Sequence, residues 1–565
     1  MIRVSQSLLR ALKESIGKGW FNYRELRDAL GSDQEAFYTL LEGYALGLFR
    51  IRGENTFEIR EEGLRLLEAW RLAGEPGVDP WIDSRVYTML RTHEKSQAPP
   101  PGEWRRVLGD RGLLEGDQLL PAALQVLELA ERLERGIVIT KAMARSLASA
   151  PTGPAPAKEY GRFLPVYEAM GLAVGSLPLN PYYSLTRPGR LLRAAVRRLN
   201  LDVPLPSVVN QSVLDALERA SRGEELTPEE KTLLGTLGYL KPTGTLDTPG
   251  RLVLRAVQAL RAARLRPPMA LSRREEQLLR AVVELWREKE AKPNLLITRE
   301  RIAEKYREIT GEQPPRDLTV DLYHLESLGL VVEGEEDAKQ VFLATETGRE
   351  LASYPGFGEG ATPTAVRAIT YPYAGLAPSL RWIDEAVKQK VLGIGGPTRK
   401  GETLVSLSGR PRKPLLTRHE MLALQRIPDR KSVSLDTVMV AVERAGGDPE
   451  VALVRMEARG LIELLPDNRV ALTEAGRLLK IAVLGVPSGI ATPIYPALVR
   501  VLEAIASGIT DISEIVNRTG LSLGTVRDAL VIMRQAKYVE KRMGLTSSGR
   551  ALLEAARILG AGWED

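Results

Sequence analysis

Residues 456–479 read Met456-Glu-Ala-Arg-Gly460-Leu-Ile-Glu-Leu-Leu-Pro466-Asp-Asn-Arg-Val470-Ala-Leu-Thr473-Glu-Ala-Gly476-Arg-Leu-Leu479. The first part predicts the end of an amphipathic helix, a glycine stop and a short β-branched strand. Residues 466–469 are turn formers that suit a hairpin tip. Thr473 is a good N-cap, and the apolar residues after it recur at helical spacing, so a second helix is expected. Gly476 lets that helix approach a neighbouring backbone closely. The predicted order is therefore helix, strand, hairpin tip, strand and capped helix.

The closing phrase of this stretch, Thr-x-x-Gly-Arg-x-Leu, recurs along the chain after a Gly-Leu-hydrophobic step. Such recurrence indicates that the polypeptide repeats one small folding unit. In weaker copies the Thr or the Gly is lost or shifted, as at 140–143, 247–250 and 398–402. The clearest copies are residues 186–192, 345–351, 473–479 and 546–552.

Two more helices precede the repeated stretch, and the resulting order resembles the winged helix-turn-helix domain. The resemblance is sharpest near the C-terminus, where 511–520 resembles the second helix and its turn, and 521–530 the start of the recognition helix. Ser522 is a natural N-cap there, and Val526, Leu530 and Met533 give a buried i, i+4, i+7 stripe. The resemblance implies a fold that is mainly α with small β-hairpins (α+β), an elongated tandem array of touching winged helix-turn-helix domains.

Segments rich in Pro, Gly, Ser and Ala at 73–80, 149–156 and 356–363 separate the helical patterns and suggest domain boundaries. The ranges that match a winged helix well are 1–73, 270–355, 415–485 and 490–560. Weaker or partial matches are 80–150, 158–200, 205–265 and 365–412. The chain also resembles an archaeal family of long proteins of unassigned function built of tandem winged helices. That resemblance rests on the overall pattern and on residues 391–401, and it implies architecture more than activity.

Composition limits the class of protein. A chain of 565 residues is too long for one core, and 44% hydrophobic residues is ordinary for a globular protein. Because no run of eighteen apolar residues and no signal-peptide pattern occurs, a soluble cytoplasmic protein is expected, with no membrane partner. The lack of cysteine excludes disulfides, Cys-type zinc sites and thiol nucleophiles. Abundant Arg, Glu and Pro suit a thermophile.

Charge is unevenly placed, although the net charge is only +6. From Arg187 to Arg198 there are five arginines and no acid, and from Arg251 to Arg274 there are seven and no acid. A third basic run lies at 410–413. Guanidinium groups bind phosphate bidentately and release counterions, so three such runs favour a polyanion partner. A solvated thermophile surface is the alternative for any single run. The candidate phosphate-binding residues are Arg187, Arg190, Arg193, Arg197, Arg198, Arg251, Arg255, Arg261, Arg264, Arg266, Arg410, Arg412 and Lys413.

The predicted recognition helices differ from one another. Ser522, Thr525 and Arg527 in the last range could meet bases or phosphates, and Arg316 and Thr319 are the comparable candidates in 270–355. The third helix of the first range opens with 33–35, and that of 415–485 opens with 448–450, both acidic. Those acids suit helix capping and would repel phosphate, so these two ranges look structural.

Catalytic patterns are lacking. His93, His324 and His419 fall in three different ranges, and no pair has metal-ligand spacing, so neither a metal nor a catalytic role is expected. Residues 393–403 invite a phosphate-loop interpretation, but Glu402 follows Gly401 where such a loop needs Lys. A glycine-rich wing tip is favoured instead. We therefore predict no enzyme, no cofactor and no small-molecule substrate.

Two classes of function remain. The first is a non-enzymatic protein that binds DNA or structured RNA through tandem winged helices and arginine-rich faces. Its length suits a ribonucleoprotein such as the ribosome, or chromatin and transcription regulation, better than an ordinary operator. The second class is a protein–protein interaction scaffold without direct nucleic-acid contact. Strong salt dependence of nucleic-acid binding would favour the first.

Overall fold

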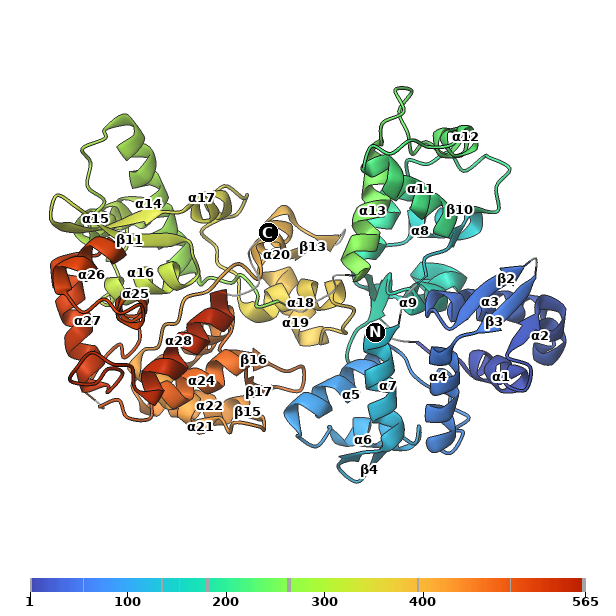
Figure 1. The fold of residues 1–565 in the computed structure, drawn as a ribbon, viewed down its shortest axis with the longest axis horizontal. Coiled ribbons are helices and arrows are strands. Elements are labelled where there is room, and N and C mark those ends of the chain that lie inside the picture. The colour runs from blue at the N-terminus through green and yellow to red at the C-terminus, as the bar shows by residue number, and fades with distance from the viewer. Residues whose placement is uncertain are drawn as a thin grey trace. The chain divides into compact units, whose positions relative to one another are not determined.

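The computed structural model describes residues 3–560, except 54, 134–135, 152, 179–181, 262–265, 394–395 and 488. The chain forms two compact units. Unit 1 comprises 1–265, 368–383 and 393–396, and unit 2 comprises 266–367, 384–392 and 397–565. Each unit is mainly helical, with short antiparallel strand pairs (Figure 1). In the described part of the chain no helix is long and apolar enough to cross a membrane.

Eight segments repeat one order of elements, and we call them modules 1 to 8. Modules 1 and 7 show it in full: three helices, a strand between the first two, a hairpin and a last helix. Their sheets have the same strand orders, β1-β3-β2 and β15-β17-β16. Module 1 comprises α1 (Gln6–Ser15), β1 (Trp20–Asn22), α2 (Tyr23–Leu30), α3 (Asp33–Ala45), β2 (Phe49–Gly53), β3 (Thr56–Ile59) and α4 (Glu61–Leu72). Module 7 comprises α21 (Arg418–Arg426), β15 (Val433–Ser434), α22 (Leu435–Arg444), α23 (Pro449–Ala458), β16 (Ile462–Leu464), β17 (Arg469–Leu472) and α24 (Glu474–Ala482).

Modules 3 and 5 keep the order with changes. Module 3 has the three-stranded sheet β7-β9-β8, and its second helix is a 3-10 helix. In module 5 the long hairpin has a regular register from Val331↔Ala344 to Glu336↔Lys339. Module 3 comprises β6 (Ile139–Thr140), α8 (Lys141–Ser149), β7 (Ala155–Pro156), η1 (Ala157–Phe163), α9 (Leu164–Ala169), β8 (Ala173–Gly175), β9 (Tyr182–Leu185) and α10 (Arg187–Val196). Module 5 comprises α14 (Arg273–Ala291), α15 (Arg299–Thr310), α16 (Leu318–Ser327), β11 (Val331–Glu336), β12 (Lys339–Ala344) and α17 (Glu346–Ala352).

The other four modules have smaller hairpins. In modules 4 and 8 the hairpin shrinks to the single bridges Leu240↔Leu246 and Val539↔Leu545. Module 2 comprises α5 (Ser84–Ser96), α6 (Gly102–Gly109), β4 (Leu114–Glu115), β5 (Gln118–Leu119) and α7 (Pro121–Arg132). Module 4 comprises β10 (Ser207–Val209), α11 (Gln211–Ser221), α12 (Pro228–Leu237) and α13 (Thr248–Arg261). Module 6 comprises α18 (Pro363–Tyr373), α19 (Leu380–Lys388), β13 (Leu392–Gly393), β14 (Gly396–Pro397) and α20 (Arg399–Leu407). Module 8 comprises α25 (Pro496–Ala506), α26 (Ile512–Thr519), α27 (Leu523–Gln535) and α28 (Ser547–Gly560).

The repeated phrase has the geometry expected from its residues. The Thr473 hydroxyl accepts a bond from the Gly476 N–H and donates to the Gly460 carbonyl at 2.6 Å, so it caps α24 and fastens it to the end of α23. A Cβ at Gly476 would overlap the Leu461 carbonyl oxygen, which confirms that glycine allows the close approach. The same two hydroxyl bonds occur at Thr186, Thr345, Thr398 and Thr546.

The helix stop before the hairpin is conserved in geometry across all eight modules of the described chain. One residue takes a positive φ, and the next is a buried apolar or tyrosine residue. Its N–H bonds back five residues, to the last turn of the helix that precedes the hairpin, as in a Schellman-type helix end. The positive-φ residues are Gly47, Gly112, Gly171, Gly238, Gly329, Lys390, Gly460 and Lys537.

Modules associate in consecutive pairs. The bridges and last-helix contacts of each pair lie within one unit, although residues 368–383 and 393–396 of module 6 belong to unit 1. In each pair the residues just before the two first helices form an antiparallel bridge, and the two last helices contact each other. The last-helix contacts are α4 with α7, α10 with α13, α17 with α20, and α24 with α28. The bridges are Val4↔Ile82, Val209↔Ile139, Leu271↔Ala361 and Leu416↔Ile494. Thr140 caps α8 of module 3, which packs on α10, so residues 140–143 do not open the last helix of module 2. That helix is α7, which has no side-chain cap.

Buried ion pairs join the modules of unit 2. Arg367 of α18 pairs with Glu457 of α23, and both side chains are almost fully buried. Arg455 of module 7 pairs with Glu275 of module 5 at 2.7 Å. Burial alone would raise the pKa of Glu275, but His324 and Arg455 beside it hold that pKa at about 2. These long-range pairs make the modules parts of one unit, because each charge depends on a partner in another module.

Candidate nucleic-acid interface

The first arginine run forms helix α10 and the residues after it. Arg187, Arg197 and Arg198 are exposed, and Arg190 and Arg193 are half-buried. The α10 face opposite them buries Leu192, Ala195 and Val196 in the core, which explains the amphipathic spacing of the run. The structure therefore places all five arginines of this run on the outward part of one helical segment.

Arg190 and Arg193 have internal contacts. The Arg190 guanidinium lies 4.4 Å from the ring centroid of Tyr373, and Arg193 Nε donates to the Ala150 carbonyl at 2.6 Å. Burial first, and then the charge of Arg197, lower the pKa of Arg193. Positive charges are thus close enough along α10 to disfavour one another.

The second run forms helix α13, which packs directly on α10. Arg251 and Arg255 are exposed and lie one turn apart on one face, and Arg266 is exposed after the helix. Arg264 and the side chain of Arg261 lie outside the described residues. In the described part of the chain no carboxylate lies within 4.0 Å of the guanidinium groups of Arg197, Arg198, Arg251 or Arg255. No acid among the described residues therefore neutralises these four guanidinium groups by direct contact.

Most residues of the third basic run contact other parts of the fold. The structure corrects the assignment of Arg412, which is only 3% exposed and donates from Nε to the Ala458 carbonyl at 2.9 Å. Burial, and then Arg410, lower the pKa of Arg412 to about 9. Lys413 lies 3.4 Å from the buried Glu326 carboxylate, while Arg410 is exposed, 3.9 Å from Glu350. This loop anchors modules to one another, and Arg412 cannot reach a phosphate.

The candidates on α27 divide in the same way. Ser522 is the N-cap, accepting from the Thr525 N–H at 3.0 Å, as its residue type predicted. The Thr525 hydroxyl donates to Glu333 of module 5 at 3.2 Å, so it faces another module. Arg527 is exposed. Of the three, Arg527 has the most open position.

The start of α16 gives a comparable picture. Arg316 is exposed, whereas Thr319 is half-buried and accepts a 3.4 Å bond from Arg299. Further along this helix the Tyr323 ring stacks on Tyr495 of module 8, with centroids 5.2 Å apart. Most of α16 is therefore covered by protein.

Two of the histidines are buried, and the described part of the glycine-rich stretch leads into a capped helix. His324 is fully buried, and burial lowers its pKa to about 3. His93 is buried with both ring nitrogens against backbone carbonyls. No cluster of three or more His, Asp or Glu that could hold a metal occurs among the described residues. Thr398 caps α20 directly after strand β14, and residues 394–395 of the stretch lie outside the described part.

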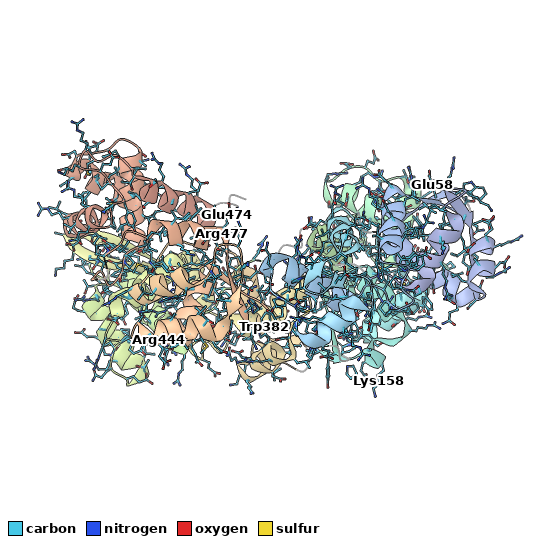
Figure 2. The ribbon with its side chains drawn as sticks, turned by 90° about the horizontal axis from the view of Figure 1, so that it is seen from below. Glu58, Lys158, Trp382, Arg444, Glu474 and Arg477 are labelled. Carbon is cyan, nitrogen blue, oxygen red and sulfur yellow. The ribbon has the colours of Figure 1, made fainter. Side chains whose placement is uncertain are left out.

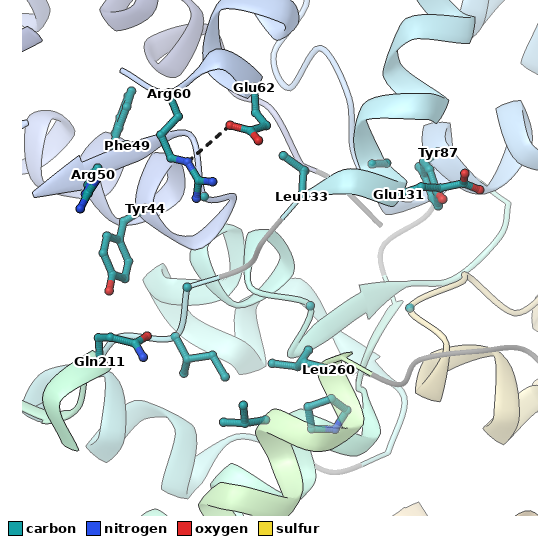
Figure 3. Close-up of a pocket in the computed structure, with 18 of the residues that line it drawn as sticks. Tyr44, Phe49, Arg50, Arg60, Glu62, Tyr87, Glu131, Leu133, Gln211 and Leu260 are labelled. Carbon is teal, nitrogen blue, oxygen red and sulfur yellow. Dashed lines mark ion pairs between the residues drawn. The ribbon is translucent and has the colours of Figure 1, made fainter. Parts of the chain in front are cut away.

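Sequence reasoning missed a large groove in unit 1. Its volume is about 1980 Å³, well above the roughly 300–1,000 Å³ of ordinary small-molecule pockets. Figure 3 shows Tyr44 and Arg50 of module 1, Gln211 and Leu260 of module 4, and Tyr87 and Glu131 of module 2 around it. Pro188 of α10 and Tyr373 also line it. No local motif marks this groove, because its walls come from segments far apart in the sequence.

Charged side chains cover the outside of both units, as Lys158 and Arg444 illustrate (Figure 2). Many surface arginines elsewhere in unit 1 lie next to an acid. Examples are Arg65–Glu61 at 2.6 Å, Arg105–Asp117 at 3.1 Å and Arg132–Glu128 at 2.6 Å. Arg197, Arg198, Arg251 and Arg255 have no such neighbouring acid among the described residues.

Comparison with known proteins gives a family and a relative. The family model described as protein of unknown function (DUF505) matches residues 76–315 and 312–556. The chain is 24% identical over 557 residues to a protein named "Uncharacterized protein MJ1355" from Methanocaldococcus jannaschii, covering 91% of this chain and 93% of that protein. No solved structure matches.

Proposed function

Since the chain belongs to the family described as protein of unknown function (DUF505), a description that gives no activity, we propose a function from geometry and charge. Unit 1 binds the phosphate backbone of DNA or structured RNA through the exposed arginines of α10 and α13, and it catalyses no reaction. The observation that carries this proposal is the set of exposed guanidinium groups at Arg197, Arg198, Arg251 and Arg255 without a contacting carboxylate.

A cluster of like charges is unfavourable for the folded protein unless something offsets it. The lowered pKa of Arg193 reflects this repulsion in part, after burial. A phosphate backbone removes the repulsion, forms charge-assisted hydrogen bonds and releases its counterions. Backbone contacts of this kind give affinity without base specificity.

The finer architecture belongs to the same proposal. Modules 1, 3, 5, 7 and 8 are winged helices, with the third helix in the recognition position and the hairpin as the wing. Modules 2, 4 and 6 are shortened forms with two helices before the hairpin. Because Tyr323 contacts module 8 and most of α16 is buried, α16 has little free surface for reading bases. On α27, Thr525 contacts module 5, whereas Arg527 is exposed. Binding is therefore mainly to the backbone, in a ribonucleoprotein such as the ribosome or on chromatin.

A protein-interaction scaffold is the second candidate. It is favoured by the same contacts, because the third helices of modules 5 and 8 already serve as protein-binding surfaces within the chain. A scaffold would bind its partner with little salt dependence, whereas phosphate binding weakens steeply as salt rises.

The test is a charge-reversal set in the full chain, with binding to heterologous duplex DNA and folded RNA measured by fluorescence anisotropy at several salt concentrations. The variant Arg197→Glu, Arg198→Glu, Arg251→Glu, Arg255→Glu should bind at least tenfold more weakly. Its salt slope should flatten by about 0.9 for each lost phosphate contact on duplex DNA. A matched variant reverses Arg27, Arg105, Arg106 and Arg132, which are exposed arginines near acids. Equal weakening by both sets would contradict the proposed site, because it would show an effect of net charge alone.

A further inference from the structure

The groove of unit 1 has a closed counterpart in unit 2. There, module 8 contacts module 5 directly: Arg500 Nη2 lies 3.0 Å from Glu326 Oε1 and 3.8 Å from Glu333 Oε2. Both carboxylates are almost fully buried, and Tyr495 stacks on Tyr323 beside them. The faces of the first and fourth modules of this unit therefore meet without a groove between them at this point.

The residues of module 5 that make this contact are replaced in module 1. Both modules can be aligned on the positive-φ residue that ends the third helix, Gly329 and Gly47. Three residues before it, Glu326 corresponds to Tyr44, and four residues after it Glu333 corresponds to Ile51. Tyr44 and Ile51 both line the groove, and Ile51 is 59% exposed. Module 1 thus lacks counterparts of the two carboxylates of module 5 that bind Arg500 of module 8.

The cation of the contact is replaced as well. Counted from the N-cap of the first helix, Arg500 corresponds to Asp215 of module 4. Burial, and then the charge of Asp215, raise the pKa of Tyr44. Where unit 2 has a guanidinium between two carboxylates, unit 1 has a carboxylate near a phenol, which gives no ion pair. The open groove therefore follows from the residues at these positions.

The interior of the groove is close to neutral. Three of its four acids have a basic partner, and the fourth, Glu58, is the cross-strand neighbour of Arg50. The ion pairs are Arg60–Glu62, Arg91–Glu131 and Arg65–Glu61. A neutral interior does not suit duplex phosphates, but it suits bases, which are uncharged and stack on aromatic rings and guanidinium planes.

The rim of the groove is continuous with the basic surface. Pro188 of α10 lines the groove, and the Arg190 guanidinium covers Tyr373, another lining residue. We propose that the groove binds an unstacked single-stranded segment of nucleic acid, with its bases among the tyrosines and its backbone continuing onto the arginines of α10. This inference rests on the proposed function and names the form of nucleic acid that unit 1 takes.

The test uses the lack of native cysteine, which makes an introduced thiol the sole labelling site. Gln211→Cys places a thiol in the groove wall at the start of α11, and Ser221→Cys places one at the other end of the same helix, about 15 Å away. Each variant is measured before and after reaction with a bulky maleimide. The probes are single-stranded RNA, single-stranded DNA and duplexes of the same sequence.

We expect labelled Gln211→Cys to lose at least tenfold in affinity for the single strands while duplex binding stays unchanged. Unlabelled Gln211→Cys and labelled Ser221→Cys should bind like the native protein. A greater loss of affinity for single-stranded RNA than for single-stranded DNA would identify RNA as the preferred ligand of the groove. Retained single-strand binding after labelling, or no single-strand binding by native protein, would overturn the groove assignment. Failure of the fourfold arginine reversal to weaken any binding would instead overturn the proposed function.

Discussion

At the scale of single residues, the phrase Thr-x-x-Gly was predictable in detail because its chemistry is local. A hydroxyl three residues before a glycine N–H caps a helix wherever it occurs, and the structure has this bond at Thr473 and at the other copies. Arg412 was not predictable in the same way. Its neighbours in sequence, Arg410 and Lys413, are more exposed, and only the contact with Ala458, 46 residues away, makes it a buried anchor.

The close approach at Gly476 gives a prediction about stability. Gly476→Ala should lower the thermal midpoint of unit 2, because the new methyl group overlaps the Leu461 carbonyl oxygen and must displace α24. Overpacking of this kind costs about 1–3 kcal/mol. Gly235→Ala is the control, since it lies inside α12 with nothing within 4 Å of its Cβ position. That substitution should be neutral or stabilising by up to about 1 kcal/mol. Differential scanning calorimetry measures both midpoints. Equal midpoints would show that the glycine of the Thr-x-x-Gly motif is not needed for the close approach of α24 to the Leu461 carbonyl.

At the scale of elements, the order of helices and hairpins followed from periodicity and turn residues, whereas the faces that the helices use did not. The arginine spacing of α10 predicted a cationic face. In the structure Arg187, Arg197 and Arg198 are exposed, whereas Arg190 and Arg193 are half-buried. Helices α16 and α27 were predicted as recognition helices. Their contacts through Tyr323 and Thr525 come from modules about 170–190 residues away, which no local pattern reports.

Buried ion pairs between elements give a second stability prediction. Arg367→Met should destabilise unit 2 by about 3–5 kcal/mol, because it leaves Glu457 buried without its partner. Arg367→Met with Glu457→Gln should recover most of this loss, since the amide carries no charge and can still accept the bond from the Leu464 N–H. Chemical denaturation of the full chain measures both variants. A double variant as unstable as the single one would show that the charge of Glu457 is not the cause.

At the scale of the whole molecule, the repeat predicted modules but not their association. The sequence indicated many small domains, and the contacts unite them into two units through paired bridges and shared last helices. The bridges join residues about 70–90 positions apart through a few backbone bonds, so they leave no sequence signature. The groove of unit 1 was missed for the same reason, because its walls come from modules 1, 2, 3 and 4 and from residues 373–376.

We propose above all that the exposed arginines of α10 and α13 bind the backbone of a nucleic acid. This proposal is tested most directly by ultraviolet crosslinking of the native protein in extract of the organism that makes it, followed by mass spectrometry of the attached peptides. The account predicts nucleotide adducts on peptides that contain residues of α10, α13 or the groove of unit 1. Adducts confined to unit 2, or recovery of protein crosslinks without any nucleotide adduct, would contradict it.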